Sequence, residues 1–287
     1  MRNSSRRSFL KSSGALAAAA YLAPKHLSAA PLRMPIGLQL YSVRAQLPKD
    51  FDGTLHQLSA EGYKVMEAAG YFNKTAVEWK HSMEAAGLRC VSTHHSLADL
   101  KSKLNELIEY GHAIGLEYMI CSWAGMHRDP ARKGELTLDD WRWVADQFNE
   151  IGAKVKAAGM TFGYHNHTIE FRSEDGLMFY DELLKRTDPK LVAMEMDCGW
   201  VVAGGAAPVH YLSQSPERFP LLHVKDLVKE PDGKWKNVVM GKGTIDYHPI
   251  FKAATGLKYY FIEQEEFTGD PLSELQQDAQ FMQSFSV

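Results

Sequence analysis

Short apolar segments alternate with longer amphipathic segments along almost the whole chain. Strict alternation of strands and helices is typical of a parallel sheet covered by helices, so this pattern limits the fold more than any other feature. We expect eight strands, at residues 36–41, 64–68, 89–93, 118–121, 161–165, 192–197, 221–224 and 258–263. A segment with helical spacing follows each strand, at 51–61, up to 86, 97–115, 138–158, 176–186, 209–214, 247–254 and 271–284.

Eight strand–helix units in about 250 residues predict a single-domain (β/α)8 barrel, the TIM barrel. The competing architecture is an open, doubly wound sheet, which usually places a glycine-rich phosphate loop after its first strand. Here the first strand continues into Tyr41-Ser42-Val43-Arg44, which contains no such loop. Glycines directly follow several expected helices, including Gly62, Gly115 and Gly256. Glycine readily accepts the left-handed conformation that ends many helices, so these positions support the predicted helix ends.

Residues 1–30 have the order of features that marks an export signal. Arg6 and Arg7 lie in a charged segment, an apolar run follows at 14–22, and small residues occupy 28–30. This order is typical of a secretory signal, and the arginine pair indicates the twin-arginine route. The apolar run is shorter than the roughly 20 residues that span a bilayer. We therefore predict a signal at 1–30, a barrel domain at 31–287 and a periplasmic location. The alternative is a disordered basic tail with a chance arginine pair.

The chain without this signal is acidic. The full sequence has 32 Lys and Arg against 35 Asp and Glu, a net charge of −3. Residues 1–30 contain five of the cations and no acid, which leaves −8 on residues 31–287. An acidic surface argues against nucleic acid as a partner. No run of 18 apolar residues occurs, so we expect no membrane association after the signal is removed. The three cysteines have neither a disulfide-framework nor a zinc-ribbon pattern, and we expect buried thiols.

Ionisable residues recur where the predicted strands end. Active-site residues of a barrel come from this end of its strands, and ionisable groups are rarely buried unless they are paired or bind a metal. Six strands carry such residues: Glu67; His94 and His95; His165 and His167; Glu195 and Asp197; His223, Lys225 and Asp226; and Glu263 and Glu265. Imidazoles mixed with carboxylates suit a divalent cation, whereas a structural zinc site usually has thiolates. Each residue alone has a plainer explanation, such as a hydrogen-bonded histidine or an aspartate that caps a turn.

Several segments carry a resemblance to a known family. They are GLQLYSVR at 37–44, YHNHTIEF at 164–171, MEMDCGW at 194–200, HVKD at 223–226, GKGTID at 241–246 and FIEQE at 261–265. They run through nearly the whole chain after residue 30. With them the chain resembles the xylose-isomerase-like, AP-endonuclease-2-type TIM barrels of the sugar phosphate isomerase and epimerase superfamily.

The resemblance implies one divalent metal held by four strand-end residues, His165, Asp197, His223 and Glu263. Mn²⁺ is the first choice, with Mg²⁺, Co²⁺, Fe²⁺ and Zn²⁺ as alternatives. The chain departs from the family at two positions. Many family epimerases have Glu where His165 stands, and the family often has His where Trp200 stands. The first departure resembles the inosose-dehydratase and keto-sugar-processing branch.

The family's shared chemistry is proton removal beside a carbonyl, which gives an enediolate. Glu263 is expected to be both metal ligand and base. Lys225 follows His223 by two residues, so both point to the same side of a strand, and Lys225 could stabilise the enediolate or act as an acid. Alternatively, Lys225 forms a structural ion pair with Glu265 or Asp226. The expected substrate-binding residues are Glu67, His95, His167, Glu265 and the two tryptophans Trp123 and Trp200, whose rings stack on a sugar face or pack in the core.

The leading functional interpretation is a metal-dependent sugar isomerase or epimerase. The first alternative is a lyase of keto-sugars or keto-glycosides, or a hydro-lyase like inosose dehydratase. A carbohydrate-binding barrel without catalysis is the non-enzymatic alternative. A phosphodiester nuclease is disfavoured because the chain is acidic and carries an export signal. The expected partner is a small sugar or keto-sugar, and the sequence leaves oligomer formation open.

Overall fold

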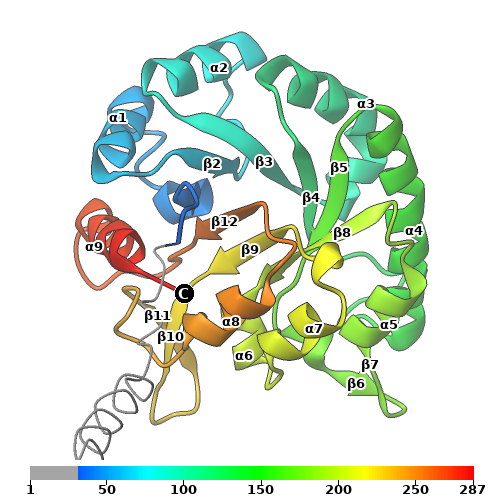
Figure 1. Cartoon of the computed structure of the whole chain (residues 1–287). Coiled ribbons are helices and arrows are strands. Elements are labelled where there is room, and N and C mark those ends of the chain that lie inside the picture. Colours follow the sequence, from blue (N-terminus) through cyan, green and yellow to red (C-terminus); the bar gives the residue numbers. More distant parts are fainter. Residues whose placement is uncertain (1–31) are drawn as a thin grey trace, which may run out of the picture. The chain divides into compact units, whose positions relative to one another are not determined.

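Eight parallel strands close into a barrel in the computed structural model, which describes residues 32–287 (Figure 1). Around the barrel their order is β1-β12-β9-β8-β5-β4-β3-β2. The strands are β1 (Gly37–Gln39), β2 (Val65–Ala68), β3 (Arg89–Ser96), β4 (Tyr118–Trp123), β5 (Thr161–His165), β8 (Val192–Asp197), β9 (Leu221–Val224) and β12 (Tyr259–Ile262). The predicted single-domain (β/α)8 barrel is therefore confirmed.

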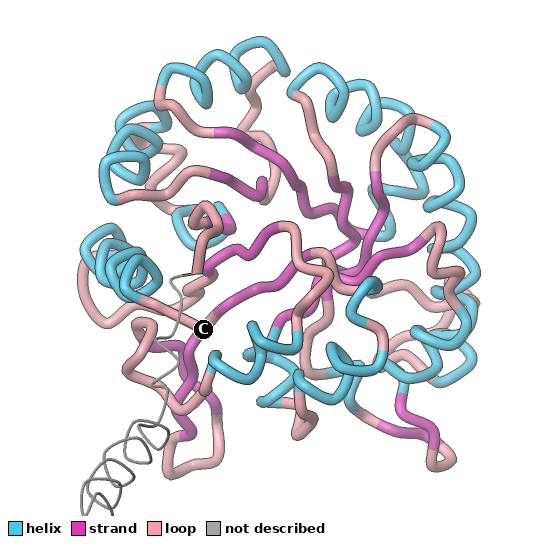
Figure 2. Tube along the Cα trace, in the orientation of Figure 1, coloured by secondary structure: helices cyan, strands magenta, loops and turns pink. Residues whose placement is uncertain are grey.

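Helices follow the strands and cover the outside of the barrel (Figure 2). They are α1 (Phe51–Glu61), α2 (Ala76–Ala85), α3 (Leu97–Ile114), α4 (Leu138–Ala157), α5 (Phe179–Arg186), α6 (Cys198–Ala203), α7 (Pro208–Gln214), α8 (Tyr247–Ala253) and α9 (Pro271–Ser284). Gly62 and Gly115 end α1 and α3 with φ angles of 111° and 81°, as expected for left-handed helix ends. Gly256 does not have a positive φ. A Cβ there would lie 2.3 Å from the Pro216 carbonyl oxygen, so close packing requires this glycine.

The structure departs from the predicted elements at the end of the first strand and in two hairpins. The first strand ends at Gln39, because the Gln39 side chain accepts a hydrogen bond from the Tyr41 backbone and a 3-10 helix, Leu40–Val43, begins there. The segment before α5 forms a hairpin, β6 (Ser173–Glu174) and β7 (Leu177–Met178), instead of helix. A second hairpin, β10 (Asp226–Lys229) and β11 (Trp235–Val238), lies where a loop was expected.

The barrel interior is apolar at one end and polar at the other. Its lower layer is a buried apolar cluster of Val65, Val91, Tyr118, Ile120, Leu221 and Phe261. Successive side chains of a strand point to opposite faces, so the residue two positions later returns to the interior. Glu67, His223 and Glu263 each follow a member of this cluster by two residues. The alternation thus stacks a layer of ionisable groups directly on an apolar floor. In the described part of the chain, no helix combines the length and the apolar character needed to cross a membrane.

Candidate active site

Four side chains at the carboxyl ends of β5, β8, β9 and β12 converge on one point. They are His165, Asp197, His223 and Glu263, and one ligand atom from each lies within 4.8 Å of the others. His223 Nδ1 lies 3.1 Å from Glu263 Oε2, and His165 Nε2 lies 3.9 Å from Asp197 Oδ2. All four side chains are buried. The strand ends therefore bring together the four residues for which the sequence predicted a common ligand role.

The donor atoms of this cluster fit a divalent cation. Asp197 Oδ2 is fully buried and lies 2.9 Å from Lys225 Nζ, an ammonium that it shares with Glu263 and Glu265. A single ammonium shared by several carboxylates leaves net negative charge, and buried charge is costly unless it is paired or bound to a metal. The neighbouring donors are two imidazoles and a second carboxylate, a mixed set that suits Mn²⁺, Fe²⁺, Co²⁺ or Zn²⁺. The excess of carboxylate charge and the donor set agree, so the residues present fit such a metal.

A second layer of buried carboxylates holds the two imidazoles of the cluster. Glu195 Oε2 lies 3.1 Å from His165 Nδ1, and Glu67 Oε2 lies 2.6 Å from His223 Nε2. Each carboxylate engages the nitrogen on the side of the ring away from the cluster. Carboxylates that hold the remote nitrogen of a metal-binding histidine fix its tautomer and its orientation. The arrangement therefore presents His165 Nε2 and His223 Nδ1 to the common point.

His94 connects these two carboxylates. Its Nε2 lies 2.6 Å from Glu195 Oε2 and 3.0 Å from Glu67 Oε2, and its ring stacks on His223. Gln39 Nε2 also donates to Glu67 Oε2, at 2.7 Å. Burial and the neighbouring Glu67 raise the pKa of Glu195 to about 7. Burial disfavours the charged form of His94, but Glu67 and Glu195 outweigh it and raise the pKa of His94 to about 9. A histidine cation between two carboxylates thus offsets their repulsion.

Lys225 is buried among three carboxylates beside the cluster. Its Nζ lies 2.8 Å from Glu263 Oε2, 2.6 Å from Glu265 Oε1 and 2.9 Å from Asp197 Oδ2. Burial disfavours the ammonium, but these three carboxylates outweigh it and raise the pKa of Lys225. The ion pair with Glu265 that the sequence left open is present. Asp226 is not part of it, because its carboxylate accepts backbone N–H groups of the loop after β9, those of Leu227, Gly241, Gly243 and Ile245.

A cavity of about 450 Å³ opens above the cluster, at the carboxyl ends of the strands. Of the residues predicted to bind substrate, His95, His167, Trp123 and Glu265 line it, together with Glu263, His165 and His94. Burial lowers the pKa of His167 to about 4 and that of His95 to about 4, so both imidazoles are neutral near pH 7. The cavity therefore offers neutral imidazoles, carboxylates and one indole ring to a polar ligand.

Two residues predicted to bind substrate lie elsewhere. Glu67 is fully buried and does not line the cavity. Its role is to hold other side chains, because its oxygens already contact His223, His94, Gln39 and Ser92. Trp200 lies in the first turn of α6, with its ring 4.5 Å from Lys225 Nζ. It therefore covers the lysine, and it is also absent from the cavity wall.

Sequence reasoning did not identify His94 and Glu195 as part of the cluster. The two-residue alternation of a strand is the sequence pattern that could have identified them. Glu195 precedes Asp197 by two residues and so shares its interior face, and His94 follows Ser92, which donates to Glu67. His95 points the other way, against Tyr71, with a ring-centroid distance of 6.1 Å. Of the two adjacent histidines, His94 faces the interior and contacts Glu67 and Glu195, whereas His95 lines the cavity.

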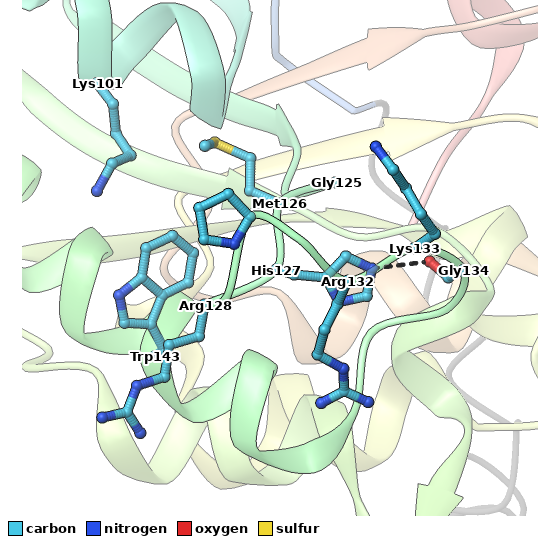
Figure 3. Close-up of a pocket in the computed structure, with 10 residues that line it drawn as sticks. Lys101, Gly125, Met126, His127, Arg128, Arg132, Lys133, Gly134 and Trp143 are labelled. Carbon is cyan, nitrogen blue, oxygen red and sulfur yellow. Dashed lines mark hydrogen bonds between the residues drawn. The ribbon is translucent and has the colours of Figure 1, made fainter.

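A separate hollow of about 500 Å³ lies between loop 125–134 and helices α3 and α4 (Figure 3). The ionisable residues that line it are all basic: Lys101, His127, Arg128, Arg132 and Lys133. His127 Nε2 lies 3.1 Å from the Gly134 carbonyl oxygen, a contact that ties the loop together (Figure 3). None of the four converging residues lines this hollow, so it is not the candidate active site.

A family model described as a xylose isomerase-like TIM barrel matches residues 55–285. The chain belongs to this family. A second model, for the twin-arginine translocation signal sequence, matches residues 3–23. This match supports export of the xylose isomerase-like barrel. The predicted boundary between residues 30 and 31 remains a prediction, because the predicted signal lies outside the described residues.

Curated relatives of this xylose isomerase-like protein include inosose dehydratases. The one from Geobacillus kaustophilus is 27% identical over 240 residues, which cover 72% of this chain and 77% of the relative. The one from Clostridium perfringens is 25% identical over 259 residues, covering 79% and 83%. A sugar phosphate isomerase/epimerase from Parabacteroides distasonis superposes with a TM-score of 0.74 at 26% identity, covering 88% of this chain and 94% of that one. The zinc-bound IOLI protein, at 12% identity and a TM-score of 0.67, shows the fold alone.

Proposed function

We propose that this protein is a divalent-metal-dependent enzyme that removes the proton beside the carbonyl of a sugar or cyclitol. The enediolate that forms then loses a hydroxyl or alkoxyl group from the adjacent carbon, which makes the enzyme a lyase. The observation that carries the proposal is the convergence of two imidazoles and two carboxylates below a polar cavity, with Lys225 beside them. His165, Asp197, His223 and Glu263 would hold the metal, with Mn²⁺ as first choice. When bound, the metal supplies Lewis-acid polarisation of the substrate carbonyl.

Glu263 is the proposed base. It lines the cavity, and its Oε2 contacts both His223 and Lys225. Burial disfavours the carboxylate, but the charges of Lys225 and His223 outweigh it and lower the pKa of Glu263. The group is therefore ionised at neutral pH and can accept a proton from a carbon above it. Geometry within hydrogen-bond reach of the reacting proton is the first requirement for such a base.

Lys225 is the proposed acid and charge stabiliser. Its Nζ lies 2.8 Å from Glu263 Oε2 and 2.6 Å from Glu265 Oε1, and both of these carboxylates line the cavity, so the lysine lies directly behind the proposed base. In the elimination, Glu263 takes the proton from the carbon beside the carbonyl. The electron pair forms a carbon–carbon double bond, the adjacent carbon–oxygen bond breaks, and Lys225 protonates the departing oxygen. An acid next to the base suits this sequence.

Elimination is favoured over epimerisation by the residue at position 165. An epimerase that inverts a carbon needs groups on both faces of the substrate, and position 165 holds histidine where many epimerases of the family have a glutamate. The inosose dehydratases among the relatives catalyse a reaction of the same class as the one proposed. Isomerisation through the same enediolate is the second candidate, supported by the likeness to the Parabacteroides distasonis isomerase/epimerase.

Proton NMR in D₂O tests the proposed function directly. The metal-loaded protein is incubated with an inosose and, separately, with a 3-keto-glucoside. A lyase gives a new unsaturated ketone, which also absorbs in the ultraviolet. An isomerase gives an isomer with deuterium at the carbon beside the carbonyl. Binding without exchange or product for any keto-sugar would show a carbohydrate-binding barrel and contradict the proposal.

Replacing Glu195 by glutamine is expected to weaken metal binding by about 10–100-fold, the usual cost of losing an outer partner of a metal ligand. Glu195 holds His165 Nδ1, and a neutral amide orients that ring less strongly. Isothermal titration with Mn²⁺ measures the change. Glu117→Gln is the matched control, because Glu117 pairs with Arg89 at the opposite end of the barrel. Equal Mn²⁺ affinity in Glu195→Gln and the control would contradict the supporting role.

We also propose a periplasmic location, supported by the twin-arginine signal match. Changing Arg6 and Arg7 together to lysine is expected to leave the precursor in the cytoplasm, because the export receptor reads the arginine pair. Fractionation of cells that express the tagged chain measures this. Normal delivery of the double variant to the periplasm would exclude the twin-arginine route.

A further inference from the structure

A second cavity, of about 230 Å³, adjoins the catalytic one at the carboxyl ends of β4 and β5. Its walls are Trp123, Gly125, Gly134, Glu135, Leu136, Trp141, Ile169, Arg172 and Phe179. Trp123 lines both cavities, so its indole ring is their common wall. The two cavities therefore meet at Trp123.

The position of Trp123 is built into the backbone around it. A Cβ at Gly125 would lie 2.1 Å from the indole Nε1, so only glycine leaves room for the ring there. The edge of the ring system also packs against His167, with centroids 5.8 Å apart and planes at 84°. Even so, Trp123 remains 52% exposed. Gly125 and His167 therefore hold Trp123 in a position where its aromatic ring can contact a ligand in either cavity.

The second cavity is apolar and offers no net charge. Leu136, Ile169, Phe179 and the two tryptophans supply most of its wall. Its two charged residues, Arg172 and Glu135, form an ion pair with each other. The other side of loop 125–134 is quite different, because the hollow there is walled by cations (Figure 3). The loop thus separates a cationic surface from an apolar one, and the apolar side faces the catalytic cavity.

We propose that the second cavity binds an uncharged apolar substituent, such as an aromatic ring, carried by the sugar whose own ring occupies the catalytic cavity. This inference rests on the proposed function and specifies its substrate class as glycosides with an apolar aglycone. The volume is sufficient, since a buried apolar cavity of about 150 Å³ holds benzene. A free cyclitol or monosaccharide would fill the polar cavity and leave the apolar one unused.

The test compares two neutral glycosides that differ only in the apolar group. Phenyl and methyl β-glucoside contain no carbonyl, so their binding is independent of turnover, and isothermal titration of the Mn²⁺-loaded protein measures it. Burying a phenyl ring against apolar walls is expected to make the phenyl glucoside bind about 10-fold more tightly or better. Leu136→Asp and, separately, Ile169→Asp should each remove this preference, because an ionised carboxylate makes the wall polar.

Val77→Asp is the matched control. Val77 lies on α2 and is 80% exposed, so this change introduces the same charge away from both cavities and should keep the phenyl preference. Thermal unfolding of each variant shows that it is folded. A phenyl glucoside that binds no better than the methyl glucoside, or does not bind, overturns the apolar subsite, as does a preference that survives both aspartate variants.

Deuterium exchange with a small keto-sugar, measured on the same preparation, separates this inference from the proposed function. Exchange or unsaturated product without a phenyl preference overturns the subsite and leaves the function standing. A phenyl preference with neither exchange nor unsaturated product from any keto-sugar overturns the function and supports the subsite.

Discussion

Lys225→Met is expected to lower kcat by about 10²–10³, the usual effect of losing one donor that stabilises transition-state charge. The ammonium contacts Glu263 and Glu265 at rest, and in the proposed mechanism it stabilises the negative charge that develops on the substrate oxygen. Methionine fills similar space without the charge. Stabilisation that appears only in the transition state changes kcat more than binding, so KM should change little.

The same substitution separates catalysis from structural support. Without the lysine, the buried carboxylates of Asp197 and Glu263 have no ammonium partner, so the metal-free variant should lose about 3–5 kcal/mol of stability, the usual cost of an uncompensated buried charge. Bound metal compensates both groups and should restore most of the loss. Lys229→Met, on the β10–β11 hairpin, is the control. A Lys225→Met enzyme with normal kcat would make the lysine only a structural ion-pair partner, and one without metal would place it in ligand support.

Asp197→Asn is expected to abolish activity and to weaken metal binding by more than the roughly 10–100-fold typical of outer partners. Asp197 Oδ2 lies 2.9 Å from Lys225 Nζ and 3.9 Å from His165 Nε2, whereas Oδ1 accepts the Trp200 backbone N–H and caps α6. Asparagine can keep the cap through its carbonyl oxygen, so the fold should survive while the anionic ligand is lost.

Mn²⁺ titration and thermal unfolding measure these two effects separately. Asp270→Asn is the matched control, because Asp270 caps α9 through the Ser273 backbone N–H and is not part of the cluster. It should leave Mn²⁺ affinity unchanged. An Asp197→Asn protein that binds Mn²⁺ as tightly as the wild type would remove Asp197 from the ligand set.

The barrel could be predicted from the sequence because each of its strands is a short apolar run between amphipathic helices. The four converging residues could be placed for the same reason, since parallel strands bring their carboxyl ends to one face. The two hairpins were missed. Each is a pair of two- or four-residue strands outside the barrel, too short for periodicity to distinguish from loop or helix.

The hydrogen-bond partners of the site residues were harder to predict than the strands on which those residues lie. Glu67 was expected to meet substrate because it ends a strand, but its partner His223 lies 156 residues away, and no local pattern encodes that contact. The same holds for His94, whose role depends on which of two adjacent histidines faces inward. A one-residue shift in strand register decides this, and the prediction ended the third strand at 93, whereas β3 runs through Ser96.

The contact between Glu67 and His223 also has a consequence for the order of folding, metal binding and export. Glu67 lies on the second strand of the barrel and His223 on the seventh, so the ring of His223 is oriented only once most of the chain has been synthesised and the barrel has closed. A protein exported by a route that carries folded cargo would leave the cytoplasm with this orientation already set. The metal it carries would then be selected from the cytoplasmic pool, and the relative abundance of Mn²⁺ and Zn²⁺ outside the inner membrane would not decide it.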